Sequence, residues 1–210
     1  MINVALPKGR LGEKVYSVLD RSGYGSKEYS ADSRKLVFSG GGVSYFWVKP
    51  SDVGVYVDTG AADMGFIGKD ILGEYPCGAY ELLDLSIGKC QMCVAGKKGF
   101  EDSFSRPLKV ATKFVNSARR YFSSVGREIE IVKLNGSVEL APVLGIADVI
   151  FDVVETGDTL RENGLEVIAR AFPISARVIV NKSAYKFKTE EINAVAEKLK
   201  GIVNYENNQL

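Results

Sequence analysis

The sequence has 210 residues, of which 46% are hydrophobic and 25% are charged, and this is enough apolar material to bury a globular core. Its formal net charge is +1, so no overall field attracts nucleic acid or a membrane, and any anion site must be local. The absence of histidine excludes Ser-His and Cys-His nucleophile systems, histidine zinc sites and a histidine general base.

Short apolar strands alternate with helical stretches along the chain, which is the pattern of an α/β protein. Strands are predicted at 2–6, 36–38, 43–48, 63–68, 79–85, 91–95, 108–111, 129–133, 147–153, 165–171 and 176–180. Helices are predicted at 11–19, 51–57, 115–125, 138–144 and 189–200, and another is expected to begin near Thr156. The pattern restarts after the polar stretch 97–102. We therefore expect two α/β domains, formed by residues 1–90 with 176–210 and by residues 91–175.

Residue types at several helix ends predict how those helices start and stop. Ser51 is the expected N-cap of the second helix, and Gly60 is expected to close it. Thr189 is the expected cap of the last helix, with Glu190 and Glu191 in its first turn.

The N-terminus and the cysteines predict a cytoplasmic protein. The sequence does not start with a basic segment and a long apolar run, so no signal peptide is expected. No apolar run approaches the ~20 residues of a membrane span. An odd number of cysteines, Cys77, Cys90 and Cys93, favours a reducing compartment. Cys90 and Cys93 have CxxC spacing without a second pair, so buried strand cysteines are favoured over redox or metal chemistry.

The stretch A-D-V-I-F-D-V-V-E-T-G-D-T-L-R-E-N-G-L, residues 147–165, is the most informative part of the sequence. It predicts a strand, a loop and a helix. The first N–H groups of a helix lack partners and carry partial positive charge, so such a helix start suits phosphate. Gly157 would let the backbone approach a ligand closely, and Thr156 and Thr159 could donate hydroxyl hydrogen bonds.

Acidic residues on both sides of this loop favour a sugar phosphate over a simple anion. Asp152 and Glu155 suit ribose hydroxyls or a Mg²⁺ ion bound to the ligand. The alternative is a plain capped helix after a buried strand, with Thr156 as the N-cap.

This segment resembles the phosphoribosyl pyrophosphate (PRPP) loop of phosphoribosyltransferases, and D-V-V-E-T-G-D-T-L-R-E-N-G-L resembles the form found in ATP phosphoribosyltransferases. Other blocks resemble the same family and follow its order along nearly the whole chain. They are L-P-K-G-R-L at 6–11, G-A-A-D-M-G-F-I-G-K-D at 60–70, A-T-K-F and A-R-R-Y-F at 111–122, and N-G-S-V-E-L-A-P at 135–142.

The resemblance implies a cytosolic, Mg²⁺-dependent enzyme that joins ATP to PRPP in the first step of L-histidine biosynthesis. It implies two α/β domains with a cleft between them, like type II periplasmic solute-binding proteins. Long-form relatives carry a further regulatory domain of roughly 70–80 residues, so this chain resembles the short form. The short form implies a homodimer within a hetero-octamer, with a regulatory subunit related to histidyl-tRNA synthetase. No nucleic-acid or membrane partner is expected.

The resemblance also implies roles for individual residues. PRPP is expected at Asp152, Glu155, Thr156, Gly157, Asp158, Thr159, Leu160 and Glu139. ATP and its polyphosphate are expected at Lys8, Gly9, Arg10, Arg34 and Lys49. The Mg²⁺ ion is expected to arrive with PRPP rather than on protein ligands.

Some of these roles have alternatives that the sequence leaves open. Lys8 and Arg10 suit a polyphosphate as a point charge and a bidentate fork, but they could be solvated surface charges. Many relatives have arginine where Lys49 stands, and lysine loses the fork geometry. Glu139 could simply cap a helix. The run 39–42 departs from the family pattern, and its role is open.

Two other functions compete with this interpretation. A phosphoribosyltransferase acting on a free purine or pyrimidine base would share the loop, but it would not need triphosphate-binding cations. A solute-binding or ligand-sensing module would share the two-domain architecture. The expected lack of a signal peptide and the sugar-phosphate loop disfavour that module.

Overall fold

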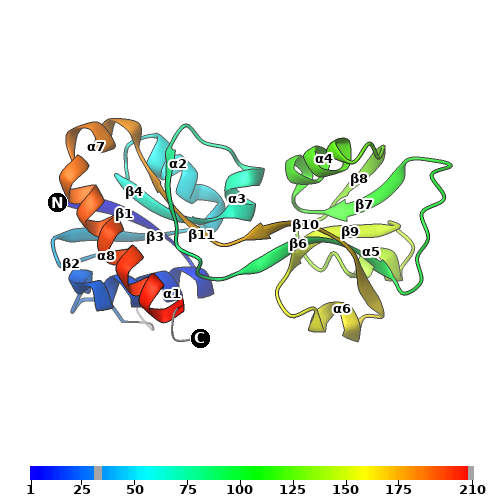
Figure 1. Ribbon diagram of the computed structural model, residues 1–210, viewed down its shortest axis with the longest axis horizontal. Helices are drawn as coiled ribbons and strands as arrows, with labels where there is room; N and C mark the ends of the chain where they lie inside the picture. Colours follow the sequence, from blue (N-terminus) through cyan, green and yellow to red (C-terminus); the bar gives the residue numbers. More distant parts are fainter. Residues whose placement is uncertain (31–34, 208–210) are drawn as a thin grey trace. The chain divides into compact units, whose positions relative to one another are not determined.

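The computed structural model describes residues 1–30 and 35–207, which form two units with a separate sheet in each (Figure 1). Unit 1 contains Met1–Gly88 and Ser175–Leu210, and unit 2 contains Lys89–Ile174. The breaks fall close to the predicted residues 90 and 175. No helix in the described part of the chain is both long and apolar enough to cross a lipid bilayer.

Unit 1 is built on a six-stranded sheet with the strand order β2-β3-β1-β4-β11-β5. The strands are β1 (Ile2–Pro7), β2 (Val37–Gly40), β3 (Val43–Val48), β4 (Met64–Gly68), β5 (Tyr80–Asp84) and β11 (Ala176–Val180). β1 is parallel to its neighbours β3 and β4, whereas β11 is antiparallel to β4 and β5. A central parallel strand is covered on both faces, which explains the continuous apolar run of β1.

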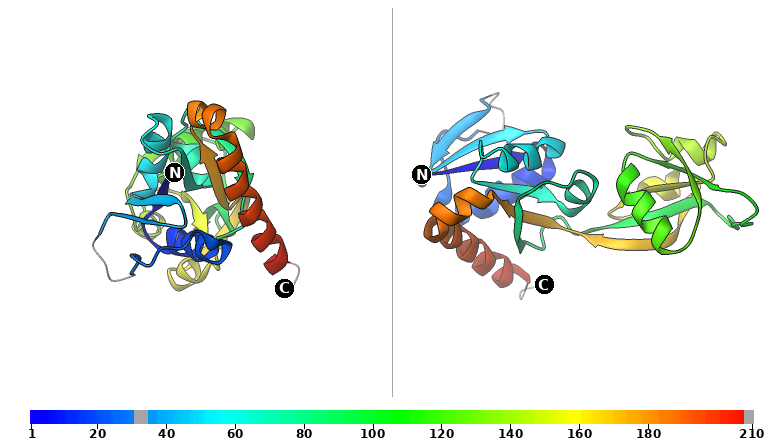
Figure 2. Two further views of the ribbon diagram at one scale, coloured as in Figure 1. Left: turned by 90° about the vertical axis from the view of Figure 1, so that its left-hand side faces the viewer. Right: turned by 90° about the horizontal axis from the view of Figure 1, so that it is seen from above.

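Helices cover both faces of this sheet. They are α1 (Arg10–Leu19), α2 (Val53–Asp58), α3 (Lys69–Glu74), α7 (Lys182–Phe187) and α8 (Thr189–Asn207), with short turns at Asp20–Tyr24 and Pro50–Asp52. On one face α1 and α8 pack against Leu6, and on the other α2 packs against Ala5. α7 leads into α8, which runs along the outside of unit 1 (Figure 2). The short helices α3 and α7 were not predicted.

Two predicted caps in unit 1 are wrong. Ser51 lies inside a 3₁₀ turn started by Pro50, and its hydroxyl donates to Asp52 Oδ1 at 2.8 Å instead of capping α2. The Thr189 hydroxyl donates back to the carbonyl of Tyr185 in the preceding helix. Gly60 does follow α2 in a left-handed conformation, with φ at 78°.

The glycine-rich run 39–42 has a packing role. It forms the turn of the antiparallel β2–β3 hairpin. A Cβ atom on Gly41 would lie 2.6 Å from the Cα of Tyr24, so the hairpin backbone approaches the segment after α1 too closely for a side chain. The Ser26 hydroxyl donates to the carbonyl of Ser39 across this contact at 2.5 Å.

Unit 2 is built on a five-stranded sheet with the order β10-β6-β9-β7-β8. The strands are β6 (Cys90–Lys97), β7 (Leu108–Thr112), β8 (Ile129–Lys133), β9 (Val149–Val154) and β10 (Leu165–Ile174). The helices are α4 (Val115–Ser124), α5 (Leu140–Val143) and α6 (Asp158–Glu162). In Figure 1, α4 lies on one side of the sheet and α6 on the other. β7 is parallel to both β8 and β9, so the carboxyl ends of these strands share one edge.

Two ion pairs tie the segment before β7 to the rest of unit 2. Arg127 donates to both carboxylate oxygens of Asp102 at 2.7 and 2.8 Å. Arg106 binds both oxygens of Asp148 at 2.7 and 2.8 Å, and the N–H of Lys109 adds a third bond to Asp148. These arginine hydrogen bonds hold the pKa of each carboxyl below its usual value.

These carboxylates predict acid sensitivity in unit 2. A carboxylate with a lowered pKa in the folded protein stabilises the fold above its unfolded pKa of about 4, and this contribution disappears as the pH falls toward the folded pKa. An Asp148→Asn variant should therefore lose less Tm than the parent between about pH 5 and about pH 3. Thermal melts over this range test the prediction, with Glu101→Gln as the exposed control in the same segment. Equal Tm losses in parent and Asp148→Asn would contradict it.

Candidate phosphate-binding site

The shared strand edge of unit 2 brings several predicted residues into one region. Lys113 follows β7, the segment 134–139 follows β8, and Glu155 follows β9. Ligands in α/β sheets bind outside the carboxyl ends of strands, so these segments are suitably placed for one. Lys113 Nζ lies 3.7 Å from Asp152 Oδ1, so a cation offsets the charge at the end of β9.

The loop between β9 and α6 has a geometry that requires glycine. Gly157 is the N-cap of α6, with φ at 79° and ψ at 7°, which is the left-handed region that side chains disfavour. The alternative of a plain helix with Thr156 as its N-cap is not realised, and Thr156 Oγ1 accepts only a long hydrogen bond of 3.4 Å from the Asp158 N–H. The Thr156 hydroxyl instead donates to the carboxylate of Asp158 at 2.5 Å.

The start of α6 presents free donors. The first turn of a helix has no intrahelical acceptors for its N–H groups. Among residues 1–30 and 35–207, the structure shows no acceptor for the N–H groups of Thr159 and Leu160. Leu160 is buried in a cluster with Ile150, which anchors the loop to the core. The loop therefore offers backbone donors from a fixed position.

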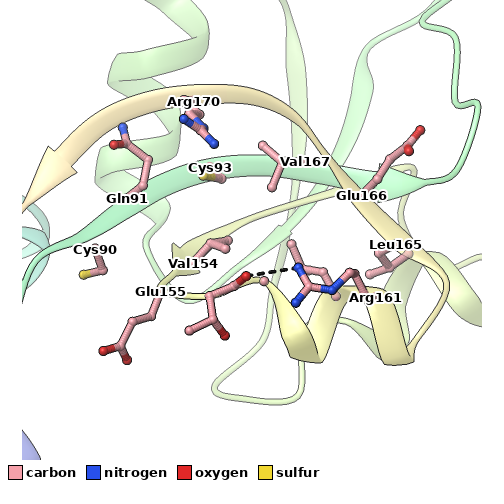
Figure 3. Close-up of a pocket in the computed structure, with 13 residues that line it drawn as sticks. Cys90, Gln91, Cys93, Val154, Glu155, Arg161, Leu165, Glu166, Val167 and Arg170 are labelled. Carbon is pink, nitrogen blue, oxygen red and sulfur yellow. Dashed lines mark hydrogen bonds between the residues drawn. The ribbon is translucent and has the colours of Figure 1, made fainter.

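A pocket of about 450 Å³ adjoins this loop, between α6 and the strands β6 and β10 (Figure 3). Four predicted PRPP residues line it: Glu155, Thr156, Gly157 and Leu160. Asp152, Asp158, Thr159 and Glu139 are not among its lining residues. One part of the loop thus borders the pocket, while the side chains of Asp158 and Thr159 in the same loop are exposed to solvent.

Sequence reasoning missed two cations of this pocket, Arg161 on α6 and Arg170 on β10. Neither belongs to a local motif that signals phosphate, and Arg170 reaches the pocket only because β10 pairs with β6 opposite Cys93. Cys90 and Cys93 also line the pocket from β6. Cys93 is buried as predicted, and that burial raises the pKa of its thiol.

Glu139 occupies the N-cap position of α5, but its side chain makes no capping hydrogen bond. The capping alternative is therefore not realised. Glu139 is half-buried and follows β8 at the same edge as the loop.

Unit 1 collects cations at the carboxyl ends of its parallel strands. Lys8, Gly9 and Arg10 follow β1 and are exposed, and Lys49 follows the neighbouring β3. The N–H of Lys8 donates to the carbonyl of Val48 at 2.8 Å, which fixes the two strand ends side by side. Gly9, with φ at 97°, caps α1 in a conformation that a side chain would strain.

Lys69, which follows β4, is a third lysine at this edge that sequence reasoning did not single out. Its ammonium lies 2.6 Å from a carboxylate oxygen of Glu81, so part of its charge is already balanced. Arg34 lies outside the described residues.

Comparison with known proteins identifies the family of the chain. Residues 49–201 match the family model described as ATP phosphoribosyltransferase. The ATP phosphoribosyltransferase of Brachyspira hyodysenteriae is 53% identical over 206 residues, covering 97% of this chain and 100% of the relative. That of Thermoanaerobacter sp. is 49% identical over 204 residues, covering 96% of each chain.

Solved structures resemble the whole chain. The ATP phosphoribosyl transferase (HisG:HisZ) complex from Thermotoga maritima contains a chain with a TM-score of 0.85 and 37% identity, and the match covers 98% of this chain and 99% of that one. The periplasmic aliphatic sulphonate binding protein SsuA from Escherichia coli has a TM-score of 0.61 at 11% identity, covering 99% of this chain and 75% of that one. This second likeness concerns the fold alone, and it confirms the expected resemblance of the fold to that of solute-binding proteins.

Proposed function

The chain belongs to the ATP phosphoribosyltransferase family, and from this membership we infer which of its residues hold each substrate. It is an enzyme that transfers the phosphoribosyl group of PRPP to ATP, in the first step of histidine biosynthesis. The loop from Glu155 to Leu160 binds PRPP. The observation that carries this assignment is the left-handed Gly157 beside the open N–H groups of α6.

The proposed PRPP-binding residues form two groups, hydrogen-bond donors and carboxylates. Backbone N–H groups of the loop, through which Asp158 takes part, and the Thr156 and Thr159 hydroxyls donate to phosphate oxygens. Asp152, Glu155 and Glu139 accept hydrogen bonds from ribose hydroxyls or stabilise positive charge that develops on the ribosyl group. Lys113 lies beside Asp152 and offsets the charge of that carboxylate next to an anionic substrate.

ATP binding is assigned to unit 1. Lys8, Arg10 and Lys49 bind the polyphosphate at the carboxyl ends of β1 and β3. Gly9, at a positive φ of 97°, keeps the backbone between the two cations free of a side chain. Arg34 is a further ATP contact proposed from the family motif.

The reaction needs no general base. N1 of adenine attacks the anomeric carbon of PRPP with a lone pair, the bond to pyrophosphate breaks, and no proton leaves N1. A chain without histidine can therefore catalyse it. The residues contribute by orienting two anionic substrates and by stabilising the charge of the departing pyrophosphate, a role for Lys8, Arg10 and the loop donors.

Mg²⁺ is proposed as the cofactor, carried by PRPP. Carboxylate oxygens are suitable ligands for this ion, which keeps several waters and binds through one or two carboxylates together with phosphates. Glu139 and Glu155 would be its carboxylate partners when it arrives with PRPP. When bound, Mg²⁺ neutralises the pyrophosphate that leaves.

We further propose that the chain acts as a short-form catalytic subunit in the cytoplasm. The matched relatives are of similar length, since 96% to 100% of each is covered. The Thermotoga maritima structure is titled as a HisG:HisZ complex. A homodimer within a hetero-octamer, with a regulatory subunit related to histidyl-tRNA synthetase, fits these likenesses.

The purified chain should form phosphoribosyl-ATP only when ATP, PRPP and Mg²⁺ are all present. Product is followed by its absorbance, with and without the synthetase-related subunit, and EDTA should stop the reaction. Free purine and pyrimidine bases in place of ATP are the controls. If free bases react and ATP does not, the enzyme is the base-specific phosphoribosyltransferase instead. If PRPP binds but no base or nucleotide reacts, the chain is a ligand-binding module.

A further inference from the structure

Arg161 connects the two sides of the loop around Gly157. Its Nη1 atom donates to the carbonyl oxygen of Thr156 at 3.1 Å, which is the dashed line in Figure 3. Its Nη2 atom pairs with the carboxylate of Asp158. The Thr156 hydroxyl donates to the other oxygen of the same carboxylate. One guanidinium thus contacts the residues on both sides of the left-handed glycine.

The contact with Thr156 also sets the direction of a donor. A trans peptide is planar, with its C=O and N–H pointing to opposite sides. While Arg161 holds the Thr156 carbonyl, the N–H of Gly157 in the same peptide points away from Arg161. The contact with Arg161 therefore keeps the Thr156 carbonyl on one side of the peptide and leaves the Gly157 N–H on the other side, where it can donate to a phosphate.

Asp158 creates an electrostatic problem for a phosphate-binding loop. The Thr156 hydroxyl and then the charge of Arg161 lower the pKa of Asp158, so it is ionised at neutral pH. An ionised carboxylate within a few ångströms of a phosphate repels it. The guanidinium bound to Asp158 offsets this repulsion.

Stability does not explain the pair. The Arg161 and Asp158 side chains are 66% and 62% exposed, and exposed ion pairs contribute little to folding. Thr156 and Gly157 line the same pocket as Arg161. The effect of Arg161 therefore falls on the loop and its ligand.

We propose that Arg161 is a positioning residue for PRPP, which neutralises Asp158 and holds the Thr156 carbonyl away from the bound phosphate. This inference rests on the assignment of the loop to PRPP. Arg161 acts through Asp158 and Thr156 and takes no part in bond making or breaking. Its loss should weaken PRPP binding without changing the binding of ATP.

Steady-state kinetics of Arg161→Ala test the proposal. The KM for PRPP should rise about tenfold, while the KM for ATP, kcat and Tm stay close to those of the parent. Arg161→Lys keeps the charge but cannot hold both partners as a fork, so it should recover part of the loss. Glu162→Gln, which changes an exposed charge next to Arg161 on α6, should have a PRPP KM within about twofold of the parent.

The double variant Asp158→Asn/Arg161→Ala identifies the cause. The Asp158→Asn change removes the charge that Arg161 neutralises, so the KM for PRPP of the double variant should return toward the parent value. High salt screens the same charge, so it should reduce the increase in KM that Arg161→Ala causes on its own. Thr159→Val, measured in parallel, tests the loop itself. An unchanged PRPP KM in Arg161→Ala beside a raised one in Thr159→Val would refute the role of Arg161 alone. Unchanged values in both would refute the loop assignment, and a loss of Tm with unaltered KM would make Arg161 structural.

Discussion

A Gly157→Val variant should lose at least about 100-fold in kcat/KM for PRPP while remaining folded. Gly157 has φ at 79°, where a β-branched side chain is strongly disfavoured, so the loop must change conformation to accept valine. A Cβ atom there would also lie 3.3 Å from Arg161 Nη1 and 3.8 Å from Val154 Cγ1, inside the pocket. Both effects displace the donors that hold the phosphate.

Thr159→Val is the milder form of this test, since it removes one hydroxyl and keeps the shape of the side chain. Loss of a hydrogen bond to a charged group costs about 1.5–3 kcal/mol, so the KM for PRPP should rise by about tenfold or more. Initial rates at saturating ATP and varied PRPP measure both variants, and circular dichroism checks their folding.

A matched control separates backbone strain from loss of the ligand site. Gly145 also has a positive φ, 72°, but it follows α5 and has open space around it. Gly145→Val should therefore cost stability without raising the KM for PRPP. Normal kinetics in both Gly157→Val and Thr159→Val would mean that the loop does not bind PRPP.

The largest loss of stability is expected from Phe151→Ala, about 3–5 kcal/mol in the free energy of unfolding of unit 2. Phe151 is fully buried on β9, where the centre of its ring lies 5.6 Å from the ring centre of Tyr121 and 6.0 Å from that of Phe122. Truncation leaves a cavity between the sheet and α4 that this packed core cannot close. β9 leads directly into the PRPP loop, so the same cavity loosens the base of the site.

Urea denaturation followed by circular dichroism measures this loss. Phe104→Ala is the matched control, because Phe104 is 72% exposed and its only ring contact among the described residues is with Arg127, 4.9 Å from the ring centre. Its cost should stay below about 1 kcal/mol. Similar losses in the two variants would show that the β9–α4 core is not the main source of stability in unit 2.

Most of the strands were predictable from the sequence, because their apolar runs are bounded by turn residues and are short enough to exclude long helices. The strand at Ile129–Lys133 matches the prediction at both ends. The helices α3 and α7, of six residues each, were missed, whereas α2 has the same length and was predicted with Gly60 marking its end. The cap at Ser51 was wrong because Pro50 starts a turn earlier, which a local capping rule does not weigh.

The sequence by itself determined the chemistry available to this protein. It contains no histidine, it carries a glycine between two threonines after a strand, and its motifs identify the family. These are properties of residue type and spacing along the chain. They establish which groups can donate, accept or carry charge near the loop.

Only the tertiary structure decided which distant residues join those groups. Arg170 lines the pocket because β10 pairs with β6, and Lys113 meets Asp152 because β7 is parallel to β9. The hydrogen bond from Arg161 to the Thr156 carbonyl likewise forms only because the loop folds back toward α6. Strand order and register set these contacts through packing across the whole sheet, and no spacing within a single segment of the sequence reports them.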